Sequence, residues 1–140
     1  MEEIDNTVTV CNWQKVVINK VYYHPDAQHS GDGQERKYEW IELYNPTDQD
    51  IDLKNWVICD NTECATINNP VAIPALGYAL VVHDAEIWKY WEIIDGVVHT
   101  YTLSGNFAMA NNADTLILKD DASVIIDQMN WGTPISTWIN

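Results

Sequence analysis

A short alternating stretch decides the fold of this chain, and it reads Glu39-Trp40-Ile41-Glu42-Leu43-Tyr44-Asn45-Pro46. Side chains of different polarity alternate along it with the period of two that is typical of a β-strand. We expect Ile41 and Leu43 to face a core, which places Trp40, Glu42 and Tyr44 on the opposite face. The last two residues are typical of a turn. The stretch therefore predicts a half-buried β-strand that ends in a turn.

Short β-rich segments separated by turn residues recur on both sides of this strand. The expected strands cover residues 16–23, 38–45, 51–53, 56–58, 79–82, 97–103, 115–118 and 124–126. The exception is residues 85–94, where Ile87, Trp91 and Ile94 share one face at helical spacing and Asp84 can cap the first turn. Many short strands with frequent turns predict an all-β sandwich or barrel, here with one short helical insert.

The length and composition fit one globular domain. The chain has 140 residues, 46% of them hydrophobic, and its seven Trp and seven Tyr supply a strong drive for burial. No linker, repeat or low-complexity tract divides it. We expect a flexible N-terminal arm over residues 1–7 and a single domain over residues 8–140. No apolar run approaches the ~20 residues of a membrane-spanning helix.

The charge balance is strongly acidic, with 21 Asp and Glu against seven Lys and Arg, and a net charge of −14. Binding to duplex DNA relies on Lys and Arg that neutralise phosphates. Because no basic run is present, we expect no nucleic-acid partner. An acidic surface keeps a domain soluble.

The sequence contains no arrangement of residues that is typical of an active site. It lacks the G-x-S-x-G setting of a serine nucleophile and any glycine-rich phosphate loop. Glu39 and Glu42 are three positions apart on one strand, so their side chains point to opposite faces and do not share a cleft. We interpret Glu42 as a structural hydrogen-bond acceptor. The sequence predicts that the domain is not an enzyme.

Candidate metal ligands lie in and beside the loop that precedes the alternating strand. Asp26, Asp32 and Glu35 offer oxygen atoms of the kind that calcium prefers, but their spacing does not match an EF-hand. The alternative is a loop that is simply solvated. Zinc needs clustered Cys or His ligands, and that pattern is absent. We therefore expect no cofactor, with calcium as an open alternative.

Two of the three cysteines lie close together in the sequence. Cys59 and Cys64 bracket four residues, and a tight turn there would bring them within disulfide range. Closing so short a loop would stabilise the domain by roughly 2 kcal/mol. The alternative is a pair of free thiols. Cys11 stands alone.

Five motifs stand in a characteristic order along the chain. They are Val17-Ile18-Asn19-Lys20-Val21-Tyr22-Tyr23-His24-Pro25, the stretch 39–46 quoted above, Ile51-Asp52-Leu53-Lys54-Asn55-Trp56-Val57-Ile58, Ile73-Pro74-Ala75-Leu76-Gly77-Tyr78 and Asn112-Ala113-Asp114-Thr115-Leu116-Ile117-Leu118-Lys119-Asp120. In this order they resemble the lamin tail domain family, in its bacterial form, over residues 16–132. The resemblance implies an immunoglobulin-like β-sandwich without catalytic activity, used as an accessory module of secreted or surface proteins.

Two functions follow as hypotheses. The first is a binding or structural module of a larger extracellular or cell-surface bacterial protein, with a protein or a cell-surface polymer as its partner. The second is a carbohydrate-binding module that uses exposed Trp and Tyr, with calcium as a possible aid. The candidate anchors are Trp40, Tyr44, Trp88 and Tyr90, since Trp and Tyr dominate binding hot spots. The alternative is that the insert folds over the strand and the two aromatic pairs bury each other.

Overall fold

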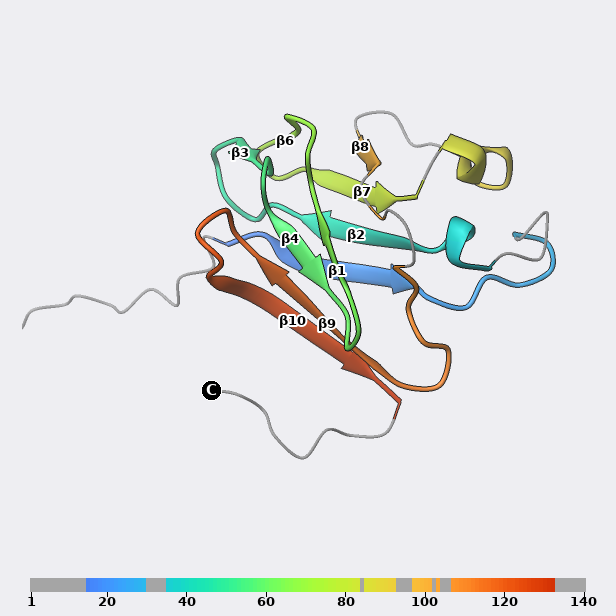
Figure 1. Ribbon diagram of the computed structural model, residues 1–140. Coiled ribbons are helices and arrows are strands. Elements are labelled where there is room, and N and C mark those ends of the chain that lie inside the picture. Colours follow the sequence, from blue (N-terminus) through green and yellow to red (C-terminus); the bar gives the residue numbers. More distant parts are fainter. Residues whose placement is uncertain are drawn as a thin grey trace, which may run out of the picture.

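A computed structural model describes residues 15–29, 35–83, 85–92, 97–101, 103 and 107–132 of the chain. The N-terminal arm predicted over residues 1–7 lies outside these ranges, and so does Cys11. The fold confirms the all-β, immunoglobulin-like sandwich that the sequence predicts (Figure 1). No helix in the described ranges is long and apolar enough to cross a membrane.

Short strands account for nearly all of the regular structure. The strands are β1 (Val17–Tyr22), β2 (Trp40–Tyr44), β3 (Ile51–Asp52), β4 (Val57–Cys59), β5 (Cys64–Thr66), β6 (Ala72–Ile73), β7 (Tyr78–Val82), β8 (Val98–Tyr101), β9 (Asp114–Lys119) and β10 (Ile125–Trp131). Two short 3-10 helices, η1 (Glu35–Tyr38) and η2 (Ala85–Lys89), complete the set.

The strands form two four-stranded sheets that pack face to face. One sheet has the order β1-β2-β7-β8 and the other the order β10-β9-β4-β5, while β3 and β6 pair as a small ribbon. In Figure 1 β4 crosses in front of β1 and β2, and β9 and β10 run below β1. The two sheets are also joined directly, because the backbone N–H of Ile18 on β1 donates to the carboxylate of Asp127 on β10 at 2.7 Å. This arrangement leaves the outer face of the first sheet on the side away from β4 and β9.

The core fills the space between the sheets, as the alternation of β2 predicts. Ile41 and Leu43 are fully buried and belong to the same cluster as Leu116 and Leu118 of β9. Trp56 packs in that cluster with 8% of its surface exposed, which confirms its expected place in the core. Burial of this much aliphatic and aromatic surface is the main drive for folding.

The turn after β2 is organised by a buried amide. The Asn45 side chain is fully buried. Its Nδ2 donates to the carbonyl oxygens of Gln49, Ile73 and Pro74, and its Oδ1 accepts from the backbone and hydroxyl of Thr47. Among the described residues, these five contacts satisfy both ends of the amide. One side chain therefore fastens the turn after β2 to the segment that enters β7.

The helix in the insert between β7 and β8 is shorter than predicted and is a 3-10 helix rather than an α-helix. The helix expected over residues 85–94 is a 3-10 helix that ends at Lys89, and a turn follows at Tyr90. Aromatic and β-branched residues lose side-chain freedom in an α-helix, and this segment is rich in them. After the insert, β8 begins beside the first residues of β7 and runs in the same direction, so the two strands pair in parallel.

Candidate functional site

The outer face of the first sheet carries cross-strand rows of side chains. Residues directly opposite each other on neighbouring strands point to the same side of a sheet. The strand register therefore gives three rows across β1, β2 and β7: Tyr22–Trp40–Val82, Lys20–Glu42–Leu80 and Val17–Tyr44–Tyr78. The insert between β7 and β8 covers the first row, and a pocket lies over the middle row.

The insert covers the first row. Val82 and Ile87 are fully buried, although neither belongs to the main core cluster. Their burial therefore comes from the insert packing over the end of β7. Figure 1 shows η2 beside η1 at this end of the sheet. The insert thus forms a second, smaller apolar layer on the outer face.

Aromatic rings hold the insert against the sheet. The Trp91 ring stands perpendicular to both Trp40 and Tyr22, with centroid distances of 5.7 and 5.0 Å. Tyr22 and Trp40 lie nearly parallel, 5.6 Å apart. Perpendicular contacts place the positive edge of one ring on the negative face of another and are favourable beyond the area they bury. The three rings therefore form a rigid corner.

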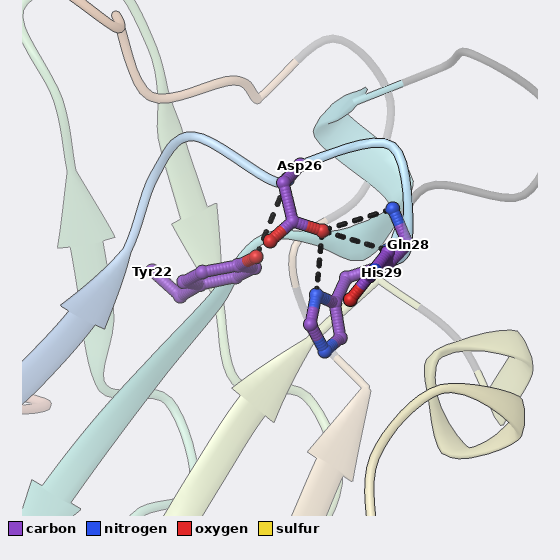
Figure 2. Close-up of polar contacts among 4 residues, drawn as sticks. All are labelled: Tyr22, Asp26, Gln28 and His29. Atoms are coloured by element: carbon purple, nitrogen blue, oxygen red, sulfur yellow. Dashed lines mark hydrogen bonds and ion pairs between the residues drawn. The ribbon is translucent and has the colours of Figure 1, made fainter.

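The loop after β1 is organised around Asp26 (Figure 2). The Asp26 carboxylate accepts from the backbone N–H groups of Gln28 and His29. It also accepts from the His29 ring, whose Nδ1 lies 2.6 Å from Asp26 Oδ1. The hydrogen bond from His29 holds the pKa of Asp26 below its ordinary value. The His29 ring so placed stacks on Trp91 at 4.4 Å.

A pocket opens over the middle row, between the sheet and the insert. Its volume is about 130 Å³. It is lined by Trp40, Glu42, Leu80, Trp88, Trp91, Glu92 and Val97. Trp91 lines the pocket, whereas His29, which stacks on the Trp91 ring, does not. The pocket and the loop therefore contact different parts of this indole ring.

The pocket is apolar in its walls and negative in its charge. Of the described residues that line it, two are glutamates and none is basic. Glu42 Oε1 accepts from Asn19 Nδ2 at 2.7 Å, which confirms the expected acceptor role, and it lies 3.9 Å from the Lys20 ammonium. Glu92 is exposed at the rim. Such a pocket can receive a small group with apolar surface and positive charge.

The predicted aromatic anchors separate into different places. Trp40 and Trp88 line one pocket. Tyr44 lies two rows away and packs on Tyr78, with ring centroids 4.8 Å apart, and Tyr90 packs edge to face on Tyr38 of η1. In the described part of the insert, Trp91 contacts Trp40, whereas the ring partner of Tyr44 is Tyr78 of β7. Both Trp40 and Trp88 remain partly exposed, so the surface that they form is open to a partner.

The predicted metal ligands do not converge among the residues that the structure describes. Asp26 is occupied by its own loop, and Glu35 Oε2 accepts from Asn111 Nδ2 at 2.8 Å. Asp32 lies outside the described ranges. In the described part of the chain, no group of three His, Cys, Asp or Glu side chains is placed to hold a metal ion.

The two carboxylates of the β2 region have different environments. Glu39 is buried, with 2% of its surface exposed, and its Oε2 accepts from the backbone N–H of Met109 at 3.0 Å. Burial raises the pKa of Glu39 to about 8, and the nearby carboxylates of Glu35 and Asp114 act in the same direction. Glu39 thus lies inward and Glu42 outward, as the strand alternation predicts. No shared acid–base site can form between them.

Cys59 and Cys64 are joined by a disulfide that closes the β4–β5 hairpin. The two residues are register partners, and their Cα atoms lie 4.0 Å apart. Within the turn, Asp60 Oδ1 accepts from the backbone N–H groups of Thr62 and Glu63. The turn therefore holds the two cysteines together independently of the sulfur bond.

Sequence reasoning missed part of the pocket. The inward side predicted for Trp91 agrees with its contacts to Trp40 and Tyr22, but the sequence did not indicate Trp91, Glu92 or Leu80 as pocket residues. The strand register places Leu80 opposite Glu42. The sequence around either residue does not predict this pairing, because β2 and β7 are far apart in the chain. The one usable signal was that Trp40 and Glu42 alternate with core residues and so share the outer face.

Comparison with known proteins gives a family for this fold. No curated protein matches the chain in sequence. The sequence profile of the Lamin Tail Domain matches residues 12–133, a range that contains both sheets, the Asn45 turn and the pocket. Members of this family are immunoglobulin-like modules rather than enzymes. The chain belongs to the lamin tail domain family.

Proposed function

We propose that this domain is a non-catalytic binding module that attaches a larger, secreted or surface-exposed bacterial protein to a protein or a cell-surface polymer. The observation that carries the proposal is the pocket between the sheet and the insert. Aromatic rings brace its walls, and the side chains of Trp88 and Trp40 remain partly exposed there. Apolar pockets with a few convergent polar groups are the usual form of a ligand site.

The charge of the domain narrows the choice of partner. With a net charge of −14, the surface repels phosphate backbones, so nucleic acid is not the proposed ligand. A neutral or basic partner is favoured because opposite charges speed the encounter of two molecules.

The disulfide supports an extracellular or surface location. Disulfides persist in oxidising compartments and are rare where thiols are kept reduced. Alkylation of the unfolded, unreduced protein, followed by mass measurement, tests this. We expect one labelled cysteine, Cys11, whereas three labelled cysteines would remove the support.

Arrays of immobilised peptides and cell-surface polysaccharides test the binding role. We expect the wild-type domain to retain at least one ligand, which Trp88→Ala loses. The matched control is Tyr44→Ala, because Tyr44 lies on the same sheet face but outside the pocket. Equal binding by Trp88→Ala and the wild type would contradict the proposal, as would a domain that binds nothing. A polysaccharide hit would favour the carbohydrate-binding form of the same role.

A further inference from the structure

The pocket has room for one small group rather than for a chain of groups. Its volume is about 130 Å³, well below the roughly 300 Å³ or more of pockets for drug-sized ligands. A dry apolar cavity of roughly 150 Å³ holds a molecule the size of benzene. A compact headgroup therefore fits, whereas a run of sugar rings needs a longer platform.

Three indole side chains line the pocket. Trp40, Trp88 and Trp91 all line the cavity, and the Trp40 and Trp91 rings meet at 89°. Indole has the most strongly attractive face for cations among the aromatic side chains, and aromatic residues set at right angles around a cavity are the usual form of sites for alkylated ammonium groups. The His29 stack and the Tyr22 contact keep the Trp91 ring in place before any ligand arrives.

The charges around the rings have the sign that a cation requires. Glu42 lies on the sheet side of the pocket and Glu92 on the insert side, and neither is buried. Lys20 lies 3.9 Å from Glu42 and balances part of its charge, whereas Lys89 pairs with Glu86 at 3.4 Å, outside the pocket lining. A carboxylate on each side thus faces a cavity that no basic side chain in the described ranges lines.

From these features we propose that the pocket binds an organic cation with an alkylated ammonium group, such as a trimethylammonium headgroup. The methyl groups bury apolar surface against the indole rings, and the delocalised positive charge interacts with the ring faces and with Glu42 and Glu92. This inference rests on the proposed function, because it names the chemical class of the group that the module recognises on its partner.

Titration with choline, followed by the methyl proton resonance of the ligand, tests the proposal. We expect saturable binding with an upfield shift of the methyl signal, because the methyl groups would lie over indole ring faces. The matched probe is 3,3-dimethylbutan-1-ol, which has the same shape as choline but no charge. We expect it to bind at least about tenfold more weakly, since it loses the cation–π and carboxylate attraction. Equal binding of the two probes would overturn the proposal.

Variants of the chain separate the two contributions. Trp88→Ala should weaken choline binding by about tenfold or more, and Glu92→Gln by about threefold to tenfold. Glu42→Gln should act like Glu92→Gln while keeping an oxygen acceptor for Asn19. Tyr44→Ala is the control and should leave choline binding unchanged. Choline binding that survives Trp88→Ala would place the cation elsewhere and overturn the proposal.

Binding measurements with further ligands identify the molecule that carries the headgroup. A peptide with trimethyllysine and free choline should both bind, whereas phosphocholine should bind more weakly, because its phosphate would lie near Glu42 and Glu92. Failure of all three probes, together with Trp88-dependent binding of an uncharged array ligand, would overturn the cation inference and leave the binding role standing. Failure of the probes and of the arrays would remove both.

Discussion

The two faces of β2 differ in burial, in polarity and in the residues that pack on them. On the inner face, Ile41 and Leu43 are fully buried and contact the opposing sheet through one continuous core. On the outer face, Trp40, Glu42 and Tyr44 stay partly exposed, and Trp91 of the insert packs on Trp40 at one end of the strand. The side chains of the inner face have no contact with solvent. The outer face carries a pocket of about 130 Å³ that the described residues leave open.

This difference assigns separate tasks to the two faces. A filled core stabilises the fold, and any loss of volume there leaves a void. Braced rings around an unfilled cavity add less to stability but present a preformed surface to a ligand. Substitutions on the inner side should therefore lower the free energy of unfolding, and those at the pocket should lower binding.

The largest loss of stability is expected from Trp56→Ala on the core side. Trp56 is 8% exposed and packs in the main cluster, so its removal leaves a large cavity. We expect the free energy of unfolding to fall by about 3–5 kcal/mol. Thermal and denaturant unfolding of both forms measure this. A loss below about 1 kcal/mol would mean that the core side is not what stabilises the domain.

Asn45→Ala should have the next largest effect, at the end of the same strand. The change removes the amide that the buried carbonyl oxygen of Ile73 contacts and the acceptor of the Thr47 N–H, whereas the Pro74 carbonyl oxygen keeps the Gly77 N–H as a donor. Each unsatisfied buried group costs about 1–3 kcal/mol, so we expect a loss of about 3 kcal/mol in chemical denaturation. Asn19→Ala is the control, because Asn19 is exposed and its side chain donates to Glu42 at the surface, and it should change stability by less than about 0.5 kcal/mol.

Glu39 makes the stability of the core side depend on pH. Its pKa is raised to about 8 in the folded state from an ordinary value of 4.5, so the folded domain holds a proton that the unfolded chain releases between these values. The stabilisation by this group is fully present below pH 4.5 and is lost as the pH rises through about 8.

Glu39→Gln should remove this dependence, because the amide resembles the neutral acid. We expect the unfolding free energy of the variant, relative to the wild type, to increase with pH across this window by at most about 1.4 kcal/mol per pH unit. Parallel denaturation curves at several pH values measure the difference. A difference that stays constant with pH would show that Glu39 is ionised in the folded domain.

The smallest effect on stability is expected at the pocket. Trp88 is only partly buried on the insert, so Trp88→Ala should cost about 1 kcal/mol, well below Trp56→Ala. Tyr44→Ala, on the same outer face, should cost a similar amount. If Trp88→Ala unfolded the domain, the insert would be part of the core and the contrast between the two faces would fail.

The sequence predicted the inner face much better than the outer one. Alternation places Ile41 and Leu43 inward by local geometry alone, and the ordered motifs indicate the sandwich. The partners of Asn45 could not be predicted, since two of them lie 28 and 29 residues away and only the fold brings them near. The turn before β10 has no glycine, and Ser123 takes the positive φ of 64° that a glycine would otherwise adopt.

The pocket was the hardest part to predict, for a physical reason. Its walls come from β2, β7 and the insert, and the shape depends on how the insert turns after Lys89. A helical pattern over residues 85–94 would have directed Trp91 inward with Ile87. The 3-10 helix ends at Lys89, and beyond it the Trp91 ring does pack inward on Trp40 and Tyr22, but it also lines the pocket, which the helical pattern did not predict.

The indole N–H resonances of the tryptophans give the most direct test of the binding role of the outer face. Choline is titrated into isotope-labelled domain, with the signals assigned by single Trp→Phe variants. We expect saturable shifts for Trp40, Trp88 and Trp91, which line the pocket, and none for Trp56 in the core or Trp131 on β10. Saturable shifts centred on Trp131, or an absence of saturable shifts at all the pocket tryptophans, would contradict the account.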